Sequence, residues 1–206
     1  LAMMVVILAL SVVAILAAII SQTIMGYTVY ELDQYVIRGL IEIVAPAGLL
    51  AALAIFFQVI LNNRWLGMAA MLVFFVISLV MSQVGFDHNL YQYGSPPGAP
   101  YSDMNGYGHF LSMVLWFLTY WGFWALLLMT LSYLLWSRGA LTPILRRLIA
   151  LPRSFTPATT GLVLVAIVGA GATGSWIFYN TNVLNTYVSG PDARRLAAEY
   201  ERQYIH

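Results

Sequence analysis

The chain is poor in charge and contains neither cysteine nor lysine. Only 8% of its 206 residues are charged, 61% are hydrophobic, and the formal net charge is +1. A soluble domain carries about a quarter charged residues, so this composition cannot cover a surface that faces water. The near-neutral balance argues against a nucleic-acid partner, because such proteins carry clusters of basic residues. The lack of cysteine excludes disulfides and thiolate metal ligands, and it leaves the redox compartment unreadable.

The first residues lack an initiating methionine and a basic leader. They read LAMMVVILALSVVAILAAIISQ and are apolar almost throughout. A signal peptide would open with a charged region and end at a cleavage site of small residues. We therefore expect the chain to be a piece of a longer protein that begins inside a membrane span.

Five apolar stretches are long enough to cross a bilayer as helices, which takes about 20 residues each. Unpaired backbone groups exclude other open structures in lipid. The mean hydropathy of +0.82 agrees with a membrane protein. The sequence therefore predicts an all-α, polytopic bundle of transmembrane helices. The expected spans are residues 1–21, 45–61, 65–83, 110–136 and 158–179, and the second is short unless it begins upstream, near Leu40.

The distribution of arginine predicts the orientation of these spans. Segment 137–157 holds four arginines and no acid, whereas segments 22–44 and 84–109 together hold five acids and one arginine. Basic residues concentrate in cytoplasmic loops. We therefore expect the 62–64 turn and the 137–157 loop in the cytoplasm. Loops 22–44 and 84–109 and the tail 180–206 should then lie on the opposite side.

Segment 30–44 admits two interpretations. Glu31, Gln34, Arg38 and Glu42 recur at helical spacing, with apolar residues elsewhere around the turn. This pattern is typical of a helix that lies in the membrane interface or re-enters it shallowly. The alternative is an early start to the second span.

A glycine-rich motif lies in the last span. GAGATG, residues 169–174, matches the G-x-G-x-x-G fingerprint of dinucleotide-binding folds. The context does not fit that fold, because no amphipathic helix follows the motif. Small residues four apart let membrane helices approach closely. We therefore assign Gly169, Gly171 and Gly174 to helix packing.

The loop 84–109 holds most of the remaining polar chemistry. Its candidate functional residues are Asp87, His88, Ser102, Asp103, Asn105 and His109. Two histidines and two carboxylates could assemble a zinc site, but their spacing matches no zinc signature. A triad through Ser102 would lack a nucleophile elbow, and haem ligation needs histidines that face each other inside the membrane. We predict a structural loop, with neither catalytic nor metal residues assigned in this chain.

The interiors of the five spans carry no charged residue. Charges inside membrane helices usually mark ion or proton pathways. We therefore expect neither an ion pump nor a proton-coupled transporter within these helices. A machine driven from outside the membrane agrees better with the pattern.

Several strings together resemble a bacterial family. They are LYQYGSPPGAPYSDMNGYGHF, WFLTYWGFWALLL, WSRG and FYNTNVLNTYVS with RRLAAEYERQY, and the likeness spans essentially the whole chain. The chain resembles ABC-transporter permeases, similar to ABC-2-type exporters, that are fused to a gluzincin zinc aminopeptidase. The resemblance implies that these helices precede the peptidase domain, whose zinc ligands and catalytic base all lie outside the 206 residues. Such permeases typically have six helices, one more than the five counted here.

The resemblance implies a location and a set of partners. We expect a multi-pass protein of the bacterial inner membrane that contacts lipid, an ATP-binding cassette subunit carrying the ATP, and a second copy of itself. The candidate surface for the ATPase is the arginine loop, with Arg138, Arg146, Arg147 and Arg153. A loop that only faces lipid headgroups is the alternative for these arginines. The alternative for the whole chain is a membrane anchor of the zinc aminopeptidase, without transport.

Overall fold

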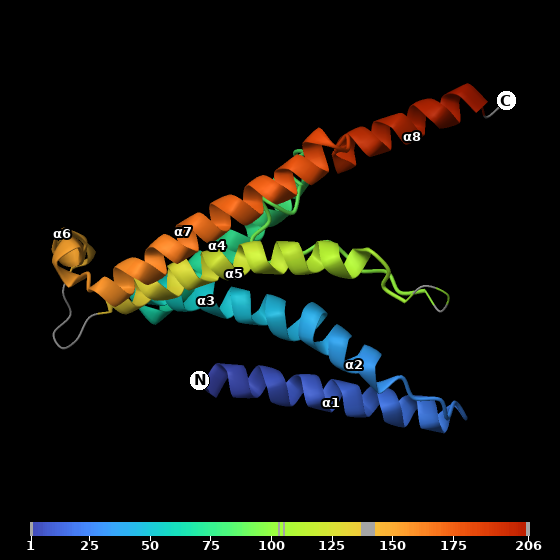
Figure 1. Cartoon of the computed structure of the whole chain (residues 1–206), viewed down its shortest axis with the longest axis horizontal. Coiled ribbons are helices and arrows are strands. Elements are labelled where there is room, and N and C mark those ends of the chain that lie inside the picture. Colours follow the sequence, from blue (N-terminus) through green and yellow to red (C-terminus); the bar gives the residue numbers. More distant parts are fainter. Residues whose placement is uncertain (1, 103, 105, 137–142, 205–206) are drawn as a thin grey trace. The chain divides into compact units, whose positions relative to one another are not determined.

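The computed structural model describes residues 2–102, 104, 106–136 and 143–204, and helices dominate this part of the chain (Figure 1). Within it, the only extended pairing is an isolated bridge between Ser102 and Gly106. The α-helices are α1 (Ala2–Ile24), α2 (Leu32–Arg38), α3 (Ala45–Leu61), α4 (Arg64–Gln83), α5 (Phe110–Leu135), α6 (Ile144–Ala150), α7 (Pro157–Phe178) and α8 (Gly190–Tyr204). Three shorter helical turns are η1 (Gly39–Val44), η2 (Leu151–Ser154) and η3 (Tyr179–Val183).

In the described part of the chain, five helical stretches are long and apolar enough to cross a membrane, which confirms the predicted all-α multi-pass class. They are Val5–Ile24, Leu32–Leu61, Arg64–Gln83, Phe110–Leu135 and Pro157–Val183. Large apolar side chains cover their surfaces: Leu72 and Leu79 in α4 are 67% and 68% exposed. Exposing these apolar side chains to water would be unfavourable, whereas contact with equally apolar lipid tails is not.

The second span is longer than expected, because α2, η1 and α3 form one helical run of 30 residues. The structure therefore joins residues 32–44 to the second span without a break, as the early-start interpretation expects. Pro46 has no N–H to donate to the carbonyl of Glu42. The helix widens into a π turn just before it, where the Ala45 N–H bonds to Leu40 O. Such a turn lets the helix continue past a proline.

The lengthened span brings charged residues into its first turns. Thirty residues extend about 45 Å, and the hydrocarbon core is about 30 Å thick. About ten residues can therefore project beyond the core, and the first ten include Arg38, which pairs at 3.6 Å with the exposed Glu42 just after them. The chain divides into two compact units, Leu1–Ala51 and Ala52–His206. Within the first, Gly39 approaches Ile15 of α1, because a Cβ at Gly39 would lie 3.4 Å from Ile15 Cδ1.

A tight turn joins α3 to α4. Asn62 adopts φ +50°, a left-handed conformation that asparagine tolerates. The Asn63 side chain accepts hydrogen bonds from the N–H groups of Trp65 and Leu66, at 2.9 and 3.2 Å, and so caps α4. Gly67 then lies against α3, since a Cβ there would be 3.3 Å from Gln58 Cα. These three residues fix α3 and α4 as a helical hairpin.

Helices α5 and α7 pack side by side and antiparallel (Figure 1). Trp116 contacts Trp176 with 5.9 Å between ring centroids. Further along, Phe123 of α5 reaches Gly169 of α7, so the pairing runs in opposite directions along the two helices. The buried face of α7 carries small residues at intervals of three or four positions, with Ala166, Ala170 and Thr173 less than 9% exposed.

The glycines of GAGATG lie on different faces of α7. A Cβ on Gly169 would fall 2.5 Å from the ring of Phe123, and one on Gly174 would fall 3.0 Å from the ring of Tyr120. A Cβ on Gly171 would meet nothing within 4 Å. The structure therefore places Gly169 and Gly174 at the contact with α5, and Gly171 away from it. All three lie inside a continuous helix, which gives the motif no phosphate-binding turn.

Two segments expected as loop and linker contain helices. The 137–157 loop includes α6 and η2, and the 180–206 tail includes η3 and α8. The sequence does not predict these helices, because they are short or rich in charge. We define the loop end of the bundle as the end where α5 begins and α7 finishes. The α6 end is the opposite one, where α5 finishes and α7 begins.

Candidate functional site

The loop 84–109 is packed onto the helices by aromatic rings and backbone contacts. Tyr93 lies edge-on to Trp121 of α5, at 5.0 Å, and to Phe74 of α4, at 6.3 Å. Trp121 donates its indole N–H to Asn89 O at 3.2 Å. The amide of Gln92 donates to Phe86 O at 2.9 Å, which closes the loop on itself. The first half of the loop is therefore a fixed element at the loop end of α4 and α5.

His88 is buried in this element and joins it to η3. The imidazole is 5% exposed, and its Nδ1 accepts the N–H of Leu90 at 3.1 Å. Nε2 must then carry the proton in the neutral ring, and it donates to Thr181 Oγ1 at 3.1 Å. Thr181 donates its own hydroxyl proton to Ile177 O at 2.8 Å. Both ring nitrogens are occupied, so His88 has no free nitrogen for a metal or a substrate.

Asp87 joins the same loop to the start of α8. Its carboxylate accepts the Tyr187 hydroxyl at 2.8 Å and the Gly190 N–H at 2.5 Å. Gly190 is the first residue of α8, whose amide groups and helix dipole favour a negative charge at this end. A residue 103 positions earlier in the sequence therefore caps this helix. We call the set of Asp87, His88, Thr181, Tyr187 and Gly190 the loop–α8 junction.

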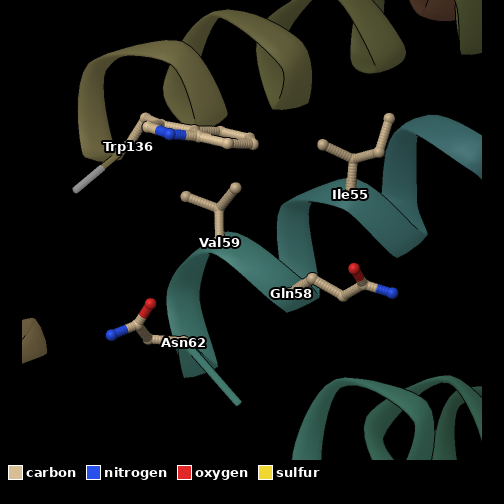
Figure 2. A pocket seen from close by; sticks show the side chains of 5 residues that line it. All are labelled: Ile55, Gln58, Val59, Asn62 and Trp136. Atoms are coloured by element: carbon tan, nitrogen blue, oxygen red, sulfur yellow. The ribbon is translucent and has the colours of Figure 1, made fainter. Parts of the chain in front are cut away.

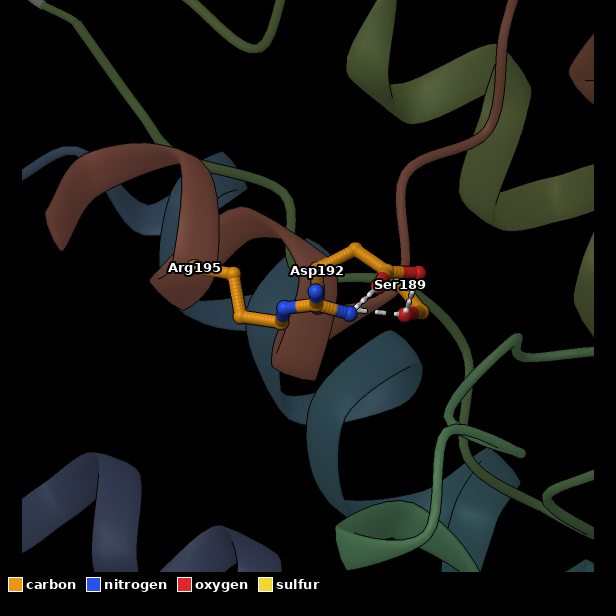
Figure 3. Close-up of polar contacts among 3 residues, drawn as sticks. All are labelled: Ser189, Asp192 and Arg195. Atoms are coloured by element: carbon orange, nitrogen blue, oxygen red, sulfur yellow. Dashed lines mark hydrogen bonds and ion pairs between the residues drawn. The ribbon is translucent and has the colours of Figure 1, made fainter. Parts of the chain in front are cut away.

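Local contacts complete the start of α8 (Figure 3). The Ser189 hydroxyl donates to Asp192 Oδ2 at 2.7 Å, and the Asp192 N–H donates back to Ser189 Oγ at 3.3 Å. Arg195 lies 4.0 Å from Asp192 in an ion pair in which both side chains are more than half exposed. Exposed pairs of this kind add little stability. The reciprocal serine–aspartate contact and Asp87 are therefore the features that define where α8 begins.

The junction shifts the pKa values of three groups. Desolvation raises the pKa of Asp87, but the hydrogen bonds from Gly190 and Tyr187 outweigh it and leave the pKa below its usual value. Burial lowers the pKa of His88, and the neighbouring Asp87 charge opposes this only in part. Burial, with the hydrogen bond to Asp87, raises the pKa of Tyr187 to about 12. At neutral pH the junction therefore holds a carboxylate, a neutral imidazole and a neutral phenol.

These shifts predict that acid loosens the junction in two steps. Because the pKa of His88 is below 6.5 in the folded chain, its contribution is complete above pH 6.5 and is lost as the pH falls below that value. The contribution of Asp87 is complete above pH 3.8 and is lost only at lower pH. We expect amide-exchange protection of residues 86–95 to fall between pH 7 and pH 5.

The variant His88→Gln separates the two steps. It should abolish the change between pH 7 and pH 5 and leave the loss below pH 3.8 intact. Protection that stays constant from pH 7 to pH 5 in the parent chain would contradict the assignment of His88.

The second half of the loop forms a small hairpin. The N–H groups of Ser102 and Gly106 each bond to the other residue's carbonyl, at 3.0 and 2.7 Å, and Gly106 adopts φ +57°. Met104 lies at the tip and is 98% exposed. Asp103 and Asn105 lie outside the described residues. His109 is exposed and precedes α5, which it does not cap through its side chain.

The four loop candidates that the structure describes are therefore distributed over separate positions. Asp87 and His88 meet at the loop–α8 junction, Ser102 forms the hairpin, and His109 lies beside a cavity at the start of α5. In the described part of the chain, no three histidine or acidic side chains group closely enough to hold a metal ion. The arrangement supports a structural role for Asp87 and His88.

Arg147 of α6 occupies a second polar junction, at the opposite end of the bundle. Its Nη1 donates to Val59 O at 2.7 Å and to Leu135 O at 2.9 Å, and its Nη2 donates to Ile60 O at 2.7 Å. Val59 and Ile60 lie in the last turn of α3, and Leu135 is the last residue of α5. One guanidinium therefore donates hydrogen bonds to terminal carbonyls of two helices. A positive charge is favourable there, because the C-terminal end of a helix carries a partial negative charge. We call this the Arg147 junction.

The four arginines of this loop thus have different roles. Arg147 is half-buried and bonded, whereas Arg146 and Arg153 are exposed, and Arg138 lies outside the described residues. Only Arg146 and Arg153 among the described arginines of the loop present their charge to a partner.

An open hollow lies at the end of α3 (Figure 2). Trp136 faces Val59 and Ile55 across a space of about 340 Å³, and Gln58 points the other way, toward the α4 residue Gly67. Asn62 closes the end of the hollow at the α3–α4 turn. None of the described residues that line it is ionisable, so the hollow offers packing space and the Asn62 amide rather than a catalytic group.

Sequence reasoning missed the partners of these junctions. Thr181, Tyr187 and Gly190 carry no motif, and Val59, Ile60 and Leu135 contribute only backbone oxygens. The one available signal was the position of Arg147 in a short apolar segment between two spans.

Searches of protein-family models, curated proteins and solved structures found no match for this chain.

Proposed function

We propose that this chain is the membrane-embedded permease region of an ABC-type transport system, fused to a zinc aminopeptidase beyond α8. The observation that carries the proposal is the Arg147 junction. It fastens α6, a short basic helix between two spans, to the ends of α3 and α5. A partner that pushes on α6 would therefore act on several membrane helices together.

The exposed side of α6 and η2 is suited to such a partner. Arg146 and Arg153 are exposed, and Leu145 and Ile149 are 66% and 71% exposed. Apolar anchors with arginines are common in protein interfaces. In this proposal ATP is bound by a separate subunit, and the chain itself contains no G-x-x-x-x-G-K-[ST] motif. The same side chains also suit the headgroup region of a bilayer, and the experiment must distinguish the two.

Photo-crosslinking from α6 tests the proposal. A photoreactive amino acid replaces Arg146 or Arg153 in the full-length protein, expressed together with its ATPase subunit. We expect adducts with the ATPase subunit from both positions. The matched control is the same group at Gln83, at the loop end of α4, from which no ATPase adduct should form. Adducts with lipid alone from positions 146 and 153 would overturn the proposal.

The alternative is a membrane anchor for the aminopeptidase, without transport. The polar helix α8 favours this alternative. Its exposed side chains Leu196, Tyr200 and Tyr204 offer a surface against which a following domain could pack. If anchoring is the whole function, cleavage after Tyr187 releases a fully active soluble peptidase, and an unrelated membrane anchor preserves function. A loss of function on replacing the helices would favour the permease.

A further inference from the structure

A cavity of about 330 Å³ opens at the loop end, between the first turns of α5 and the end of α7 with η3. One part of its lining is apolar and aromatic, with Met113, Trp116, Phe117 and Trp176. The other part is polar, with His109, Ser112 and Asn180. Ligand cavities commonly have this volume and this combination of apolar walls with a few polar groups.

The two parts of the cavity follow the polarity of a bilayer. Trp116 lies six residues inside the start of α5, or about 9 Å along the helix. Trp176 lies four residues before Asn180, or about 6 Å deeper. The tryptophans therefore lie toward the hydrocarbon and the polar groups toward the headgroups, where tryptophan is common. A molecule that fills both parts must be amphiphilic.

The polar part is rich in hydrogen-bond donors. The N–H group of Ser112, in the first turn of α5, has no partner among the described residues, whereas those of Phe110 and Met113 are bonded. The Ser112 hydroxyl and the His109 ring add further donors. Asn180 uses one amide hydrogen on Trp176 O, at 2.7 Å, and keeps the other.

Among the described residues, no acidic side chain lines this cavity. A free N–H at a helix N-terminus, with a hydroxyl, an imidazole and an amide beside it, suits a headgroup that accepts several hydrogen bonds. A phosphate ester has this chemistry, and the aromatic part of the cavity suits the first segment of an acyl chain.

We propose that this cavity binds a phosphate-bearing membrane lipid. Its phosphate lies among Ser112, Asn180 and His109, and its acyl chain lies along Trp116 and Trp176. The proposal goes beyond transport and anchoring and holds equally for either, because it depends only on the cavity and the bilayer.

Two photoreactive lipids test the proposal on the unmodified full-length protein in nanodiscs. One is phosphatidic acid with a diazirine in its acyl chain, and the other is diacylglycerol with the same chains and no phosphate. We expect the phosphatidic acid to label peptides that contain Trp116 or Trp176 at least about tenfold more than the diacylglycerol does. The reason is that diacylglycerol lacks the charged phosphate to which the donors of the cavity bind. Equal labelling of these peptides by the two lipids would overturn the proposal.

Two further arms sharpen the result. The double variant Ser112→Ala, Asn180→Leu should reduce labelling by phosphatidic acid about tenfold, whereas Ser82→Ala, at the end of α4, should not change it. Unchanged labelling of the double variant would place the phosphate elsewhere and contradict the assignment. If millimolar inorganic phosphate displaces the lipid, the cavity recognises free phosphate, and the lipid proposal fails.

Discussion

Replacing Arg147 by methionine should destabilise the bundle by about 3 kcal/mol, because hydrogen bonds from a charged donor contribute roughly 1.5–3 kcal/mol each and are not additive. Methionine keeps an unbranched apolar side chain, so the change removes mainly the donors. Terminal carbonyls of α3 and α5 then lose their shared partner. Thermal unfolding in detergent, followed by near-ultraviolet circular dichroism of the tryptophans, measures the effect.

The neighbouring arginine provides a matched control. Arg146 is exposed, so Arg146→Met should change stability by no more than about 0.5 kcal/mol, as surface substitutions do. Arg147→Lys should recover only part of the loss, because a single ammonium cannot reproduce a fork that reaches two helices. Equal effects at positions 146 and 147 would show that the three contacts do not stabilise the bundle.

Gly169→Leu should separate α5 from α7 and cost about 3 kcal/mol, the upper range for inserting atoms into a filled contact. The added Cβ would lie 2.5–2.6 Å from three atoms of the Phe123 ring, and the rest of the side chain must also be accommodated. Gly171→Leu is the control, since its Cβ would meet nothing within 4 Å. Leucine there should be neutral or slightly stabilising, because it favours helix more than glycine.

A second substitution identifies the cause of this loss. If the Phe123 ring is the obstacle, Gly169→Leu should destabilise the Phe123→Ala variant less than it destabilises the parent chain. This non-additivity is measured by a double-mutant cycle in the same unfolding assay. Additive effects of the two substitutions would mean that Gly169 does not contact α5 in the folded protein.

The helices were predictable because their physical cause is local. A run of about 20 apolar residues without charge specifies a membrane span, whatever lies around it. The expected span 65–83 and the observed α4, Arg64–Gln83, differ at one end by a single residue. The start of the second span was less predictable, because Pro46 is compatible both with a helix start and with the π turn that the structure contains.

The junctions were not predictable because their partners lie far apart in the sequence. Arg147 bonds to carbonyls 88 and 87 residues earlier, and backbone carbonyls have no signature in the sequence. His88 is a candidate from its residue type alone. Its neutral state depends on Leu90 and Thr181, which composition cannot connect to it. Gly169 and Gly171 have the same local pattern, and only the position of Phe123 distinguishes them.

The cap that Asp87 places on α8 also sets an order for biogenesis. Gly190 is synthesised 103 residues after Asp87, which takes about 5–20 s at a translation rate of roughly 5–20 residues per second. During that interval the carboxylate waits without its helix, while α5 and α7 are inserted. The bond can close only when both helices have crossed the membrane and brought Tyr187 and Gly190 back to the same side. Its closure therefore reports that α5 and α7 have both been inserted.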